Sequence, residues 1–206
     1  MGAAMSDPRD LAIQSLTPTL MAPRFGALDA PETGLHRYIL GANGLYIQAH
    51  SRALQLCIKV SDTPPLPYGE VREYVRMANG LLPQALYRQM KEKAVNACPK
   101  EWAGVVVFDR DTAAYRLVEP EVCSASAGHV TYSMGNFALE DVVLDIHSHA
   151  TGAAYFSTTD DRSDQQGIYL ATVLGECGHP DTISTTTRIV INGQFFPVPW
   201  TPWSES

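Results

Sequence analysis

The sequence predicts a mixed α/β fold, in which a curved mixed β-sheet is flanked by helices and preceded by a small β-rich extension. Apolar and β-branched runs of strand length occur at residues 100–108, 141–149 and 167–174. A helical pattern of apolar residues occupies residues 82–98, ahead of the first of these runs. Strands and helices therefore alternate irregularly, without an internal repeat, and this order is typical of a mixed sheet.

The composition allows one sizeable domain and a small appendage. The chain has 206 residues, of which 45% are hydrophobic, and a formal net charge of −7. This acidic balance argues against broad nucleic-acid binding, which needs a basic face. No apolar run has the length of a membrane span, and residues 1–20 lack the pattern of a secretion signal. A cytoplasmic protein that contacts neither nucleic acid nor membrane is expected.

The cysteines are widely spaced and form no C-x-x-C pair. This spacing indicates neither a disulfide framework nor a zinc site built from thiolates. We expect reduced thiols, mostly in the core, at all four positions: Cys57, Cys98, Cys123 and Cys177.

The first part of the chain is predicted to be β-rich. Residues 36–49 have the pattern of a hairpin, and Asn43-Gly44 is its turn signal. Residues 52–60 add a further strand with partial alternation of apolar and polar side chains.

A proline-rich stretch at residues 61–69 predicts a linker. The chain is therefore expected to divide into an N-terminal β-rich extension, residues 1–65, and a main domain, residues 66–206. The main domain is expected to open with a short helix over residues 70–79, capped by Gly80.

Residues 82–98 predict one long amphipathic helix. Pro83 suits its first turn and Pro99 ends it. A strand of β-formers follows over residues 100–108 and begins with an acid, Glu101. The buried face of the helix is marked by apolar residues at four-residue spacing, namely Leu82, Leu86, Met90 and Ala94.

The end of the chain predicts two more strands and an aromatic tail. Residues 187–191 and 194–198 are strand-like, and Asn192-Gly193 forms the turn between them. In the tail, Trp200 and Trp203 could form a docking surface or fold back onto the core.

Two histidines lie at the end of the predicted strand 141–149. Alternate side chains of a strand point to the same face, so the Cα atoms of His147 and His149 are expected roughly 6–7 Å apart. After a loop, Ser157-x-x-Asp160 opens a predicted helix. Two imidazoles and a carboxylate are the three N/O ligands of a catalytic zinc site, which leaves a fourth position for water.

Each of these features also has an ordinary structural explanation. A serine three residues ahead of an acid is a helix-capping signature, so Ser157 and Asp160 could serve only to start a helix. Glu101 could lie on a solvated strand edge. The H-x-H pair, however, requires a third ligand nearby, which favours the zinc site. A zinc site in turn needs a general base beside it, which favours a site role for Glu101.

The combined pattern resembles a known family. Glu101-x-x-Gly104 at a strand start, followed by H-S-H-x(7)-S-x-x-D from His147, is similar to the JAMM/MPN (JAB-type) metalloproteases over about residues 81–200. The resemblance implies a cytidine-deaminase-like layout of sheet and helices. It also implies one catalytic zinc ion, held by His147, His149 and Asp160.

By the same resemblance, Glu101 would accept the proton of the attacking water, and Ser157 would hydrogen-bond the oxyanion of the tetrahedral intermediate. Many family members have proline after the second histidine, whereas this chain has Ala150. That proline shapes a loop and binds no metal, so the departure bears on substrate fit more than on chemistry. Some members have lost the ligands, and a non-catalytic MPN scaffold is therefore the alternative function.

The length, the β-rich extension and the tail at 195–200 further resemble the A proteins of the bacterial PRTRC system. There a JAMM protein accompanies a ubiquitin-like protein and a relative of ubiquitin-activating enzymes. The resemblance implies a zinc isopeptidase or peptidase that cuts after the C-terminus of a ubiquitin-like partner. The strands 102–108 and 142–149 are expected to accept the partner's extended tail by backbone pairing. A zinc deaminase is nearly excluded, because the chain has no P-C-x-x-C.

Overall fold

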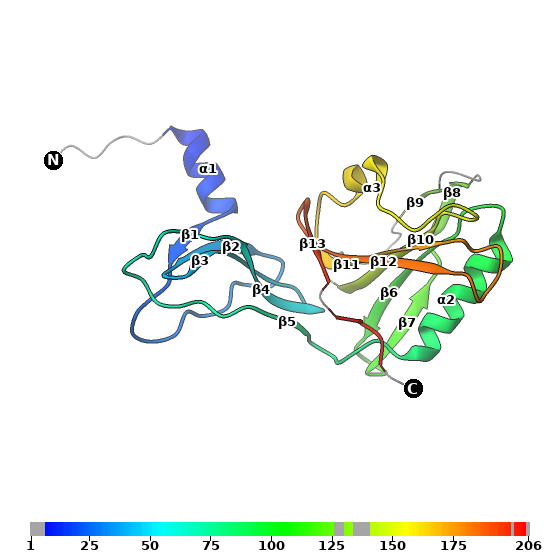
Figure 1. Cartoon of the computed structure of the whole chain (residues 1–206), viewed down its shortest axis with the longest axis horizontal. Helices are drawn as coiled ribbons and strands as arrows, with labels where there is room; N and C mark the ends of the chain where they lie inside the picture. The colour runs from blue at the N-terminus through cyan, green and yellow to red at the C-terminus, as the bar shows by residue number, and fades with distance from the viewer. Residues whose placement is uncertain (1–6, 126–129, 134–140, 199, 205–206) are drawn as a thin grey trace. The chain divides into compact units, whose positions relative to one another are not determined.

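The computed structural model describes residues 7–125, 130–133, 141–198 and 200–204 (Figure 1). The chain divides into two compact units, Met1–Arg76 and Met77–Ser206. This division falls later in the chain than residue 65, because the segment after the proline-rich stretch adds a strand to the N-terminal sheet. Among the described residues, none of the helices has both the length and the apolar character that crossing a bilayer would require.

The N-terminal unit contains a five-stranded sheet of order β1-β2-β3-β4-β5. Strands β2 and β3 form the predicted hairpin, in which Gly41 is paired with Gly44 across the turn. Tyr46 and three other buried residues form the core of this unit. Its elements are α1 (Pro8–Leu16), β1 (Thr19–Met21), β2 (His36–Gly41), β3 (Gly44–His50), β4 (Leu54–Ser61) and β5 (Tyr74–Met77).

One predicted element of this region is wrong. Residues 70–79 contain strand β5 and not a helix. Tyr74 packs against the buried cluster around Tyr46, and its hydroxyl accepts a hydrogen bond of 3.0 Å from Gln48 Nε2. Burial of this aromatic ring and pairing with β4 outweigh the local helix propensity, which is a weak determinant when tertiary contacts compete.

The second unit is built on a six-stranded sheet of order β13-β12-β11-β10-β6-β7. Strands β10 and β11 are parallel and the other neighbours are antiparallel, so the fold is the mixed α/β fold that the sequence predicts. The elements are α2 (Gln84–Ala97), β6 (Ala103–Asp109), β7 (Ala114–Val118), β8 (Glu121–Ala125), β9 (Val130–Ser133), β10 (Val142–Ser148), α3 (Thr158–Ser163), β11 (Ile168–Gly175), β12 (Ser184–Ile191) and β13 (Gln194–Pro197).

The two faces of this sheet have different partners. Helix α2 covers one face (Figure 1), and its Tyr87 hydroxyl lies 2.7 Å from the Thr185 hydroxyl of β12. On α2, Met90 and Ala94 are fully buried, as the four-residue spacing predicts. The other face carries a separate buried apolar cluster from β6, β10, β11 and β12, against which Phe156 and Phe195 pack. Because alternate residues of a strand share a face, His147 of β10 belongs to this second face.

The contact between β6 and β10 continues one residue beyond their last paired residues, Ala103 and His147. The Ser148 backbone N–H donates to the Trp102 carbonyl at 2.8 Å, and the Trp102 N–H donates to Ser148 Oγ at 2.8 Å. Glu101 directly precedes Trp102, and His149 directly follows Ser148. The segment ahead of β6 is thereby fastened to the histidine end of β10.

Replacing Ser148 with alanine should weaken this junction. Ser148 is fully buried, so Ser148→Ala leaves the Trp102 N–H without its acceptor in a water-free environment. An unsatisfied buried donor costs about 1–3 kcal/mol, and we expect the free energy of unfolding to fall by that amount in urea titrations. Ser163→Ala, at an exposed helix position, is the control and should change it by less than about 0.5 kcal/mol. Equal stability of both variants would show that the junction contributes nothing.

Candidate metal centre

The two histidines and the aspartate of the predicted zinc site converge. His147 Nε2 lies 3.3 Å from His149 Nε2 and 3.2 Å from Asp160 Oδ1. The three ligand atoms all lie within 4.8 Å of one another. The side chains of His147 and Asp160 are only 12% and 16% exposed. Asp160, eleven positions after His149, thus joins the two histidines in one half-buried cluster at the end of β10.

The spacing of these atoms fits a tetrahedral zinc ion. Ligand atoms held about 2.0–2.1 Å from one ion at tetrahedral angles are about 3.3–3.4 Å apart. The separations measured from His147 Nε2, 3.3 Å and 3.2 Å, agree with this geometry. Imidazole nitrogen and carboxylate oxygen are also ligands that zinc accepts. The three side chains therefore pass both tests, of donor type and of spacing, for a zinc site.

A hydrogen bond orients the second histidine toward the other ligands. His149 Nδ1 lies 3.1 Å from the Ala153 carbonyl oxygen, which can only accept, so Nδ1 carries the hydrogen. The lone pair of a neutral His149 is then on Nε2, the atom that faces His147. The exposed ring of Tyr155 packs edge-on against His149, with centroids 4.7 Å apart. A metal-binding histidine usually donates its other ring N–H to an acceptor of this kind, as His149 Nδ1 does to the Ala153 carbonyl.

The loop after His149 lies against the end of β11. The His149 N–H donates to Leu174 O at 2.8 Å, and a Cβ at Gly175 would lie 2.1 Å from Ala154 N. Only glycine therefore permits this close approach. Ala150 has a φ of +47°, a left-handed conformation that proline, fixed near −65°, cannot adopt. Ala150, at the position where many family members have proline, thus has a backbone conformation that a proline there could not adopt.

Ser157 and Asp160 form a helix cap, and Asp160 is also part of the ligand cluster. Ser157 Oγ accepts from the backbone N–H groups of Thr159 and Asp160, and Asp160 Oδ2 accepts from the Ser157 N–H at 2.6 Å. This is a complete capping box at the start of α3. The other oxygen of Asp160, Oδ1, faces His147. The two explanations considered for this motif therefore do not exclude each other.

The hydrogen bonds of Ser157 leave its hydroxyl hydrogen available. A serine hydroxyl has two acceptor lone pairs and one donor hydrogen. Both lone pairs are directed at backbone N–H groups of α3, at 3.2 Å and 3.3 Å. The hydroxyl of Ser157 can consequently act on a bound molecule only as a donor, which is the role that an oxyanion needs.

Glu101 is buried beside the cluster. It is 7% exposed, so it does not lie on a solvated strand edge, which was the alternative to a site role. Burial, with a contribution from the negative charge of Asp160, raises the pKa of Glu101 to about 7. A carboxyl group with this pKa can both accept and release a proton at neutral pH, as a general base must.

Burial favours the metal-binding form of His147. Burial lowers the pKa of His147 well below its usual value, and this effect exceeds the opposing attraction of the Asp160 carboxylate. A neutral imidazole is the form that binds a metal ion. In the cluster, the lone pair of His149 and the carboxylate of Asp160 both point at His147 Nε2, an arrangement that a shared cation would stabilise.

A second group of residues next to α3 was not predicted. Arg188 of β12 donates to Asp161 Oδ1 at 2.5 Å and to Asp164 Oδ2 at 2.7 Å. Acids are common near the start of a helix, so their presence there does not point to such a contact. An arginine in an otherwise β-branched strand is a weak signal, and nothing in its neighbours along the chain reveals its partners.

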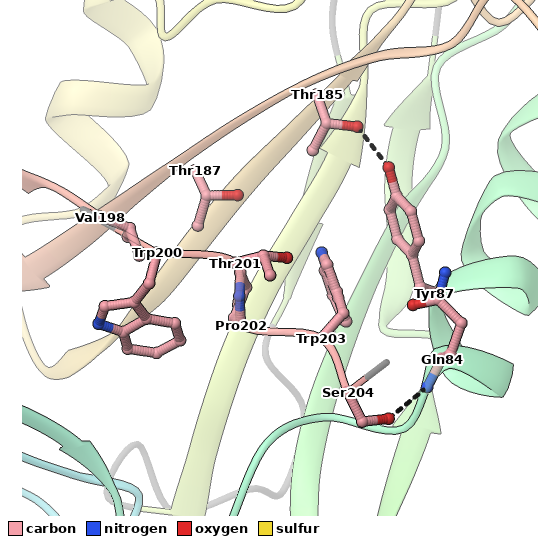
Figure 2. A pocket seen from close by; sticks show the side chains of 10 residues that line it. All are labelled: Gln84, Tyr87, Thr185, Thr187, Val198, Trp200, Thr201, Pro202, Trp203 and Ser204. Carbon is pink, nitrogen blue, oxygen red and sulfur yellow. Dashed lines mark hydrogen bonds between the residues drawn. The ribbon is translucent and has the colours of Figure 1, made fainter. Parts of the chain in front are cut away.

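A cavity of about 680 Å³ lies on the opposite face of the sheet and is separate from the metal cluster. Figure 2 shows it between β12 and the C-terminal segment, with Thr185 and Thr187 along one side. Thr186 alternates with these two and donates to Ala154 O, on the face of the histidines. Trp203 is 7% exposed and stacks on Tyr87, so this part of the tail folds onto the core; Trp200 is half-buried and lines the cavity.

Comparison with known proteins assigns the chain to a family. Residues 83–189 match the prokaryotic homologs of the JAB domain, and this segment lies within the second unit. The match covers more than half of the chain, so the protein belongs to this JAMM/MPN-type family, which includes metallopeptidases. Residues 7–78 match a domain of unknown function, DUF2016. No curated protein matches the chain.

The ligand cluster predicts the metal content of the protein. We expect about one zinc ion per chain after purification without chelators, as a single three-ligand site holds one ion. His149→Ala should remove most of the zinc while the protein stays folded, because the sheet has its own apolar core. His179→Ala is the control, because the His179 side chain is 67% exposed and outside the cluster. Elemental analysis that finds wild-type zinc in His149→Ala would remove this residue from the site.

The raised pKa of Glu101 predicts a pH-dependent stability of the metal-free protein. Its pKa is 4.5 in the unfolded chain and about 7 in the fold, so the fold favours the protonated form. The stability that this adds is complete below pH 4.5 and is lost as pH rises through 7.

Glu101→Gln cannot ionise and should therefore become more stable relative to the wild type as pH rises from 4.5 to 8. The expected gain is about 3 kcal/mol, at about 1.4 kcal/mol per pKa unit. Urea unfolding with a chelator present, at several pH values, measures it. The exposed position Glu92 provides the control Glu92→Gln, which should show a constant difference. A constant difference for Glu101→Gln as well would mean that Glu101 titrates normally.

Proposed function

We propose that this protein is a zinc-dependent peptidase or isopeptidase that hydrolyses the bond after the C-terminus of a ubiquitin-like protein. One observation carries the proposal. The ligand atoms of His147, His149 and Asp160 converge at zinc-like spacing, with the buried carboxyl group of Glu101 beside them. Membership of the family of prokaryotic JAB homologs supports the same chemistry.

The residues of the site divide the work of hydrolysis. A zinc ion held by His147, His149 and Asp160 would supply Lewis acidity, polarising the scissile carbonyl and making water acidic near neutral pH. Glu101 accepts a proton from the attacking water, and its pKa of about 7 suits it to pass the proton on to the leaving amine. Ser157 donates its free hydroxyl hydrogen to the oxygen that gains negative charge.

The route of the substrate is not the one expected from the sequence. Strand β10 pairs with both β6 and β11, and β6 pairs with both β10 and β7. Within the described sheet, these strands are therefore internal, so a substrate tail cannot add to the sheet along β10. We place the tail over the loop after His149, where Tyr155 is 57% exposed and packs against the His149 ring. An exposed aromatic side chain offers an extended peptide a rigid contact surface.

The partner is proposed from the family resemblance and from the shape that the chemistry requires. A tail that ends in small residues reaches a half-buried metal cluster with the least steric conflict. Unstructured peptides would also lose more conformational freedom on binding than a tail presented by a folded protein. A ubiquitin-activating-like enzyme of the same system is the other partner that the PRTRC resemblance suggests.

The test uses a ubiquitin-like protein fused through its C-terminus to a reporter, with casein as an unfolded control. The zinc-loaded wild type should release the reporter and leave casein largely intact. Glu101→Gln should keep its zinc but cleave the fusion about 10²–10⁴-fold more slowly, the usual contribution of general acid–base catalysis.

Casein digestion with the fusion left intact would indicate a general peptidase. Zinc binding without any cleavage would favour the scaffold, and loss of zinc in Glu101→Gln would make Glu101 a ligand.

A further inference from the structure

Arg188 is a buried cation at the centre of a contact network around α3. Its side chain is 8% exposed, although it lies on a strand of an otherwise apolar and β-branched pattern. The guanidinium lies between two aromatic rings, 3.9 Å from the centroid of Phe156 and 3.8 Å from that of Phe195. Planar stacking of this kind fixes the orientation of a guanidinium group.

The two terminal nitrogens of Arg188 bind two acids that are three residues apart, about one helical turn. One donates to Asp161 Oδ1 at 2.5 Å and the other to Asp164 Oδ2 at 2.7 Å. Asp164 is held from its other oxygen by the Tyr169 hydroxyl, at 2.8 Å. Asp161 directly follows Asp160 in the chain, and Asp164 N–H donates to the Asp160 carbonyl at 2.9 Å. The fork of Arg188 thus holds the turn that begins with Asp160.

Helix α3 has little else to hold it. None of its residues Thr158–Ser163, all of which the structure describes, is buried. A six-residue helix cannot form by its own propensity, because nucleation alone is unfavourable and most helices are stabilised by an apolar face. The position of α3 on the sheet therefore depends on contacts made from its side and its ends, which are the Arg188 fork and the packing of Phe156, just before the helix, on the sheet.

We propose that Arg188 is a positioning residue for the metal site: it holds α3 on the sheet so that Asp160 Oδ1 stays within ligand distance of the two histidines. This inference rests on the proposed zinc site. A buried ion pair with two carboxylates is weak evidence for extra stability, because desolvation offsets the attraction. Its geometric effect is direct, since a planar group with two donating arms fixes two points of the helix at once.

The charge of Arg188 lets the test separate electrostatics from positioning, because the two effects change zinc affinity in opposite directions. A cation near the site repels a zinc ion, so removing that charge should tighten zinc binding if electrostatics alone matters. Loss of positioning should weaken it. Arg188→Met removes the charge and the fork but keeps an apolar stem between the rings. Arg188→Lys keeps the charge and loses the fork, so any change in affinity reports geometry.

The experiment measures zinc affinity of the full chain by competition with a chromophoric chelator, well below the unfolding temperature of each metal-free variant. We expect zinc binding about 10–100-fold weaker in both variants, the range found for residues that orient metal ligands. Ile189→Val is the stability control, because this buried residue is next to Arg188 on β12 but faces α2, and its zinc affinity should be unchanged. Arg116→Met, at a 56% exposed arginine on β7, is the charge control and should also be unchanged.

Equal or tighter zinc binding in Arg188→Met and Arg188→Lys would overturn the inference and leave the proposed function intact. Should Arg188→Met fail to fold, Arg188→Lys alone decides between the outcomes, because it changes the geometry at constant charge. Absence of zinc binding by the wild type would instead remove the metal site itself, and both proposals with it. A loss of affinity in Ile189→Val equal to that in the arginine variants would assign the effect to general destabilisation and reject positioning.

Discussion

The pairing of β6 with β10 is the constraint on which the rest of the site depends. It joins the segment ahead of β6 to the end of β10 through reciprocal contacts between Trp102 and Ser148. Glu101 directly precedes Trp102, and its carboxyl group is close enough to the cluster to be affected by the charge of Asp160. Both strands are internal to the sheet, where hydrogen bonds on two sides make them rigid. The proposed general base and the two histidines of the candidate site are thereby fixed by backbone geometry. Asp160, the third residue of the cluster, comes from a short helix that needs its own attachment.

Burial gives the site its electrostatic character. Burial disfavours charge on Glu101 and on His147. It therefore shifts the pKa of Glu101 upward and that of His147 downward, which favours the uncharged form of each. On the helix, three aspartates fall within five residues, and Arg188 compensates two of them. The uncompensated carboxylate is the one that faces the histidines.

The sequence was most informative where chemistry depends on short spacing. The H-x-H pair and the Ser-x-x-Asp motif are local. Strand periodicity alone predicts that the two histidines share a face, and the spacing of serine and acid alone predicts a helix start. The prediction of a helix at residues 70–79 failed because distant contacts decide there: Tyr74 packs on the N-terminal sheet, and the segment contains strand β5. Arg188 could not be assigned from sequence, since its partners Asp161 and Asp164 lie 27 and 24 positions away. The internal position of β10 was equally invisible, because a buried strand has the same pattern with one neighbour or two.

The capping box at α3 has a consequence for how this motif should be interpreted in other sequences. Asp160 uses one oxygen to start a helix and directs the other at the histidines. A relative that abandoned metal binding would lose any selective reason to keep H-x-H, yet the same helix start would still benefit from its serine and acid. Surveys that rely on the Ser-x-x-Asp half would then overcount enzymes, and the histidine pair is the more discriminating half. Alanine scanning has the same ambiguity at Asp160, where a truncated side chain removes a cap as well as a ligand.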